Sequence, residues 1–141
     1  MANYVKFDQF VEDLAKKVHN LNSDTLKVML TNTAPVAGNS VMADLTEIAA
    51  GNGYTAGGSA ATFVSGAQSS GTYKLVLNDV TFTASGGSIG PFRYAVLYND
   101  TPTSPADPLI AFWDYGTSIT LTNGNSLTVN LDQSSGVFTL V

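Results

Sequence analysis

Alternation of apolar and polar residues in the second half of the chain most constrains its fold. Apolar residues recur at every second position in two neighbouring stretches, first at Tyr73, Leu75 and Leu77 and then at Val80 and Phe82. A period of two places such side chains on one face of a β-strand. Repeated short stretches of this kind, separated by turn-forming residues, are typical of an antiparallel β-sandwich. The sequence therefore predicts a mainly β fold.

We expect about eight strands in all, as the spacing of a sandwich requires. Beyond the two stretches above, strands are predicted over 25–31, 60–65, 92–98, 109–115, 119–121, 127–131 and 137–141. Both faces of 92–98 are largely apolar, which predicts a central strand that is covered on both sides. Asn123-Gly124 is a strong hairpin signal, so 119–121 is expected to pair with 127–131.

The N-terminal segment carries the one convincing helical pattern, which we place at residues 4–20. Its apolar side chains form a stripe with a period near 3.6 residues, at Phe7, Phe10, Val11, Leu14 and Val18. We therefore expect an amphipathic helix or arm over 1–22, packed on the same domain, and a β-sandwich over 23–141. The stripe fits either core packing or contact with a partner.

Composition excludes several classes of function. The 141 residues predict a single domain. Lysine and arginine total 6 against 11 acidic residues, a net charge of −5 that argues against nucleic-acid binding. Cysteine is absent, which excludes disulfides and thiol chemistry. We see neither a signal peptide nor an apolar run long enough to span a membrane, so we predict assembly in the cytoplasm without membrane contact.

Three motifs suggest chemistry, but each lacks its required context. Residues 86–90 match G-x-S-x-G, yet Pro91 and a strand follow where a nucleophile elbow needs a helix. Residues 51–56 match G-x-G-x-x-A, and the glycines that come next will not begin a helix. Asp100, Asp107 and Asp114 form no compact calcium loop. We therefore predict a protein that is not an enzyme and has no cofactor or metal.

The aromatic stretch 112–115 is the best candidate for a contact surface. Phe112 and Trp113 are adjacent on a predicted strand, so they point to opposite faces, and we expect one in the core and one facing outward. An exposed Trp113 and Tyr115 beside Asp114 would suit either a protein interface or stacking on a sugar.

Several segments together resemble a family of small virion proteins of tailed bacteriophages, closest to head decoration (cement) proteins with a jelly-roll-like sandwich. They are residues 1–7 (MANYVKF), 21–28 (LNSDTLKV), 45–49 (LTEIA), 53–58 (GYTAGG), 70–75 (SGTYKL) and 92–100 (FRYAVLYND). The resemblance extends over nearly the whole chain. It implies no catalytic residues.

The resemblance also implies a location and partners. Such proteins sit on the virion, bind a shell of major capsid protein with the HK97 fold, and self-associate as dimers or trimers. We expect contacts from the glycine-rich loop 51–59, the proline-rich loop 99–108, the N-terminal arm and the aromatic stretch. The candidate interface residues are Phe7, Phe10, Tyr54, Gly57, Gly58, Asn99, Asp100, Pro102, Pro105, Trp113 and Tyr115. The alternative is a phage tail or adsorption protein that binds a host-surface glycan.

Overall fold

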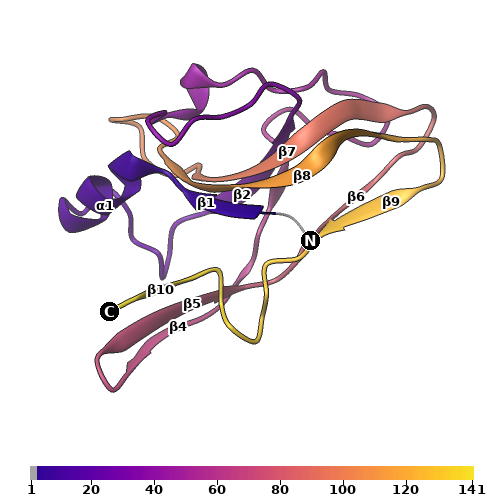
Figure 1. The fold of residues 1–141 in the computed structure, drawn as a ribbon. Helices are drawn as coiled ribbons and strands as arrows, with labels where there is room; N and C mark the ends of the chain where they lie inside the picture. The colour runs from indigo at the N-terminus through magenta and orange to yellow at the C-terminus, as the bar shows by residue number, and fades with distance from the viewer. Residues whose placement is uncertain (1–2) are drawn as a thin grey trace.

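The structure, a computed structural model, describes residues 3–141 (Figure 1). In this range the chain forms ten strands, one α-helix and one short 3-10 helix. In chain order they are β1 (Asn3–Lys6), α1 (Asp8–Ala15), β2 (Leu26–Thr31), η1 (Met42–Asp44), β3 (Ser59–Ala60), β4 (Phe63–Ser69), β5 (Thr72–Leu77), β6 (Val80–Thr83), β7 (Ile89–Asn99), β8 (Leu109–Leu121), β9 (Ser126–Val129) and β10 (Phe138–Leu140).

The predicted mainly β fold is confirmed. The strands form a five-stranded sheet in the order β1-β8-β7-β2-β3, a three-stranded sheet in the order β10-β5-β4, and the pair β6-β9. Neighbouring strands are antiparallel in every sheet. Figure 1 shows the β4–β5 hairpin and β10 on one side of the five-stranded sheet, an arrangement that is consistent with a β-sandwich.

The N-terminal helix is shorter than predicted, because 4–20 divides into a strand, a helix and an irregular segment. Tyr4 and Val5 belong to β1, which pairs with Trp113 and Phe112 of β8. The helix begins only at Asp8 and ends at Ala15. Beyond it, Lys17 adopts a left-handed conformation with φ of 65°, which turns the chain out of the helix.

The five-stranded sheet is buried on both faces, which explains the largely apolar residues of β7. On one face a core cluster includes Val28, Leu97 and Trp113, together with Leu75 and Phe82 from the other two sheets. The opposite face carries a second cluster around Phe7, Met29, Tyr94, Tyr98 and Phe112. Side chains from the long segment between β2 and β3, Met42 and Leu45, pack against that second cluster.

Phe112 and Trp113 do point to opposite faces, since they join different clusters. The expectation that one of them faces outward is wrong, because both side chains are buried. The segment between β2 and β3 covers the face that carries Phe112. The same segment contains the 3-10 helix at 42–44.

The hairpin predicted across Asn123-Gly124 is wrong. β9 pairs with β6, where Phe82 lies opposite Leu127, and not with β8. The end of β8 is already paired with β7, because Leu121 lies opposite Ile89. The turn itself docks on the end of β6, where the Gly124 amide donates to the Ala84 carbonyl over 2.8 Å.

Candidate functional site

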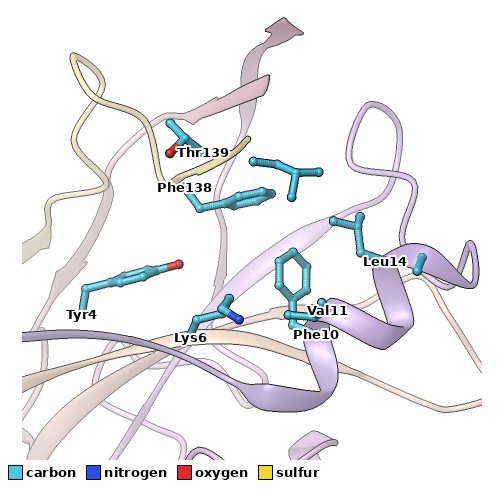
Figure 2. Close-up of a pocket in the computed structure, with 9 residues that line it drawn as sticks. Tyr4, Lys6, Phe10, Val11, Leu14, Phe138 and Thr139 are labelled. Atoms are coloured by element: carbon cyan, nitrogen blue, oxygen red, sulfur yellow. The ribbon is translucent and has the colours of Figure 1, made fainter. Parts of the chain in front are cut away.

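An apolar groove of about 650 Å³ lies between α1, β1 and β10 (Figure 2). We call it the α1–β10 groove. Figure 2 shows Tyr4 on one side, Phe138 opposite it, and the side chains of Phe10, Val11 and Leu14 along the helix. The lining residues are Tyr4, Lys6, Phe10, Val11, Leu14, Ala15, Phe138, Thr139 and Leu140.

Local sequence explains how the walls form. Val11 lies three residues before Leu14 and Phe10 lies four before it, so the three side chains share one side of the short helix. Phe10 is buried at the base, where its ring meets that of Phe138 at a centroid distance of 5.2 Å. The ring of Tyr4 packs edge-on against Trp113 at 5.6 Å, which fixes the far end.

The rim of the groove exposes apolar surface to an unusual degree. The side chains of Val11, Leu140 and Tyr4 are 55, 52 and 40 % exposed. Exposed large apolar side chains that gather around a concave surface mark sites of interaction with another molecule. The groove therefore has the surface chemistry of a docking site.

The groove extends beyond its first hollow. Leu14 and Leu140 also line a neighbouring hollow of about 350 Å³, which reaches Tyr73 and Leu21. Together the two hollows follow the helix along β10. The two hollows together reach from Tyr4 of β1 to Leu21 beyond the helix, so several consecutive residues of a bound chain segment could contact them.

Charge in the first hollow comes from a single lysine, and Lys17 lines the neighbouring hollow. Lys6 is the one ionisable cation among the lining residues, and the lining contains no carboxylate. Within residues 3–141 the salt bridges involve Lys16, Lys27 and Arg93, so Lys6 takes part in none of them. Burial raises the pKa of the Tyr4 hydroxyl, which keeps that end of the groove neutral.

Two edge strands line the groove. β1 ends the five-stranded sheet and β10 ends the three-stranded sheet. In the described part of the chain, each therefore has a strand partner on one side only. The backbone amides and carbonyls along the other side are available to an additional strand.

Five of the eleven candidate interface residues lie in the interior of this chain. They are Phe7, Phe10, Tyr54, Asn99 and Trp113. Of these, Phe10 alone contributes to the groove, as its base. The remaining candidates are more open: Gly57, Gly58, Pro102 and Tyr115 are half-buried, and Asp100 and Pro105 are exposed.

The glycine-rich loop 51–59 is fastened to the protein. The Tyr54 hydroxyl donates to the Glu47 carboxylate at 2.6 Å and accepts from the Leu30 amide at 3.0 Å. The Gly57 amide donates to the same carboxylate at 2.7 Å. Burial, and next the bond to Glu47, raise the pKa of Tyr54, so the phenol keeps its proton. These bonds describe a loop that is ordered without a partner.

The proline-rich loop 99–108 is also anchored at its start. The buried Asn99 amide donates to Asp24 at 2.7 Å, and Asp100 forms a salt bridge with Lys27 at 2.9 Å. Pro105 reaches the polar side of α1, where it helps to line a separate hollow of about 340 Å³ with Gln9 and Glu12. The structure thus brings the helix and this loop together, but on the side of α1 away from Val11.

Sequence reasoning missed most of the groove. Its walls include Tyr4, Val11, Leu14, Phe138 and Leu140, of which Val11 and Leu14 were noted only as part of the helical stripe. The pairing of β10 with β5, which sets Leu140 opposite Tyr73, left no local signal in the sequence. The one signal in the sequence was the apolar helical stripe, which has more apolar residues than the short helix can bury against the sheets.

Residues 3–141 contain no group of three or more histidine or acidic side chains placed to hold a metal ion. No helix in the described range is long and apolar enough to cross a membrane. Comparison with known proteins found no matching family model, no matching curated protein and no matching solved structure.

Proposed function

We propose that this protein is a non-enzymatic decoration (cement) protein of a tailed-phage capsid, located on the virion. The observation that carries the proposal is the α1–β10 groove, an exposed apolar surface bounded by two edge strands. Surfaces of this kind are used for protein–protein contact. The resemblance to phage decoration proteins supplies the partner, a shell of major capsid protein with the HK97 fold.

The mechanism is stabilisation by mass action. A protein that binds the assembled shell, but not free subunits, shifts the equilibrium toward the shell. Because many symmetry-related copies bind, a modest binding free energy at each contact adds up to a large stabilisation of the shell. As part of the same proposal, the chain self-associates as a dimer or trimer on the shell, and its sheets form a jelly-roll-like sandwich.

The alternative, a tail or adsorption protein that binds a host glycan, gains no support from the aromatic stretch. Trp113 is buried beneath Tyr4, and Tyr115 is half-buried. A stacking platform for a sugar needs exposed ring faces. Glycan binding therefore remains the alternative function.

The test is to separate purified source virions into heads and tails and to quantify this protein by mass spectrometry against the major capsid protein. We expect about one copy per capsid subunit in the head fraction, as symmetric coverage of a shell requires. A few copies confined to the tail fraction would contradict the proposal and favour the glycan-binding alternative.

A further inference from the structure

We propose that the α1–β10 groove takes up an extended polypeptide segment of the shell subunit, which adds as a strand to the edge of β1 or β10. The segment carries alternating apolar side chains and one carboxylate that pairs with Lys6. This inference rests on the proposed function, because it names the shell as the source of the segment. It identifies both the surface used and the chemistry of the occupant.

The backbone of the groove supports a strand as the occupant. β1 and β10 are both edge strands, and they lie on opposite sides of the same hollow. An extended peptide satisfies its own amides and carbonyls by pairing with such an edge, whereas a helix or a compact ligand leaves the edge unpaired. Figure 2 shows this arrangement, with Phe138 and Thr139 of β10 facing Tyr4, Lys6 and the helix across the opening.

The side chains of the groove support an apolar face on that strand. Val11 and Leu140 stand exposed on the two sides, over a base formed by Phe10 and Phe138. In an extended segment every second side chain points the same way, so alternate residues enter the groove and the others face solvent. Burying the exposed parts of Val11 and Leu140 provides the apolar driving force.

Charge argues for a partner and against a second copy of this chain. Lys6 is the one charged side chain that lines the first hollow, and it has no salt bridge in residues 3–141. A contact between two identical grooves supplies no carboxylate for Lys6, because the lining contains none. A shell segment with an aspartate or glutamate meets Lys6 with opposite charge, which favours the correct partner and register.

The experiment measures co-sedimentation of the full-length protein with phage shells assembled without it. Leu140→Asp places a charge at the exposed rim, and Lys6→Glu reverses the charge in the groove. Each is expected to weaken shell binding at least tenfold. Val64→Asp and Lys16→Glu are the matched controls, because both residues are exposed and neither lines the α1–β10 groove or the hollow next to it. The controls are expected to bind like the wild type, and circular dichroism verifies that all four variants fold.

Hydrogen exchange on the wild-type protein then tests strand addition itself. Binding to the shells is expected to slow exchange of backbone amides within 3–6 or 138–140. Wild-type binding by the two groove variants, or unchanged exchange in both strands, would refute the inference and leave the decoration function intact. Failure of the wild type to sediment with shells would overturn both. A smaller solution mass for Leu140→Asp than for the wild type would identify the groove as a contact between copies and also overturn the inference.

Discussion

Phe7 lies at the junction of β1 and α1, and its side chain has no exposed surface. Its ring packs on Phe112 at a centroid distance of 5.1 Å, within the second core cluster. We predict that Phe7→Ala lowers the free energy of unfolding by about 3–5 kcal/mol, since truncating a buried phenylalanine leaves a cavity. Urea denaturation measures this loss.

Val11, four residues further along, is the control for Phe7, because more than half of its side chain is exposed. Val11→Ala is expected to change the free energy of unfolding by less than about 0.5 kcal/mol, as is usual for exposed positions. Equal losses at Phe7 and Val11 would show that β1 and the helix do not occupy the positions described.

Gly58 illustrates a backbone requirement in the glycine-rich loop. Its φ is +79°, and a Cβ at this position would collide with the carbonyl of Val28. Gly71, at the β4–β5 turn, has a similar φ of +83° but open space around it. We predict that Gly71→Ala costs about 1–2 kcal/mol, the cost of a left-handed conformation, and that Gly58→Ala costs clearly more. Thermal unfolding of both variants measures the two losses of stability. An equal loss in Gly58→Ala and Gly71→Ala would contradict the packing of Gly58 on β2.

His19 gives the protein a specific pH dependence. Burial lowers the pKa of His19, although the carboxylates of Asp13 and Asp24 oppose this shift. Asn99 adds a further preference for the neutral ring, because its amide donates toward Nδ1 at 3.1 Å. The folded protein therefore binds this proton less readily than the unfolded chain, whose histidine has a pKa near 6.5.

The sign of the effect follows from proton linkage. Above pH 6.5 both states hold His19 neutral, and the full stability is present. As the pH falls below 6.5 the unfolded state takes up a proton first, so stability decreases until the folded-state pKa is reached. We predict that His19→Gln removes this decrease between pH 7 and 5, measured by urea denaturation at each pH. An identical pH profile in the variant would assign the decrease to other groups.

At the scale of the elements, the N-terminal segment belongs to the core. β1 pairs with β8, and Phe7 and Phe10 are buried. We predict that deletion of residues 1–20 abolishes cooperative thermal unfolding, since it removes an edge strand and two aromatic core residues at once. Near-ultraviolet circular dichroism detects the loss through Trp113. A truncated chain that still unfolds cooperatively would mean that this segment is an appendage.

Elements with a strong local pattern could be predicted from the sequence, and those decided by distant partners could not. The alternation at Tyr73, Leu75 and Leu77 located β5, and the two apolar faces of 92–98 located a central strand. The length of the helix could not be predicted, because Tyr4 and Val5 form a strand that pairs with the distant β8. The same reason applies to β9, which the Asn-Gly signal assigned to the wrong neighbour.

The candidate site shows the same division. Phe10 was identified from the helical stripe, but the groove that it underlies depends on β10 returning to the helix across more than a hundred residues. Trp113 was expected at the surface because nothing in its own segment predicts that Tyr4 packs beside it, or that residues of the other two sheets join it in one core cluster.

At the scale of the whole molecule, one core cluster joins all three sheets. Trp113 from the five-stranded sheet, Leu75 from the three-stranded sheet and Phe82 from the β6-β9 pair belong to it. Sheets that share a core unfold together. We predict that tryptophan fluorescence and far-ultraviolet circular dichroism give the same midpoint in urea. Two separate midpoints would mean that the sheets are independent units.

The pairing of β1 with β8 has a consequence for the order of events during synthesis. Asn3 lies opposite Asp114, so β1 leaves the ribosome more than a hundred residues before the strand with which it pairs. Until then its apolar residues and those of α1 are unprotected, and contacts between such distant residues form slowly. β1 is therefore paired only after most of the other strands have been made, and a ribosome that stalls before residue 114 releases a chain that depends on chaperones or is degraded.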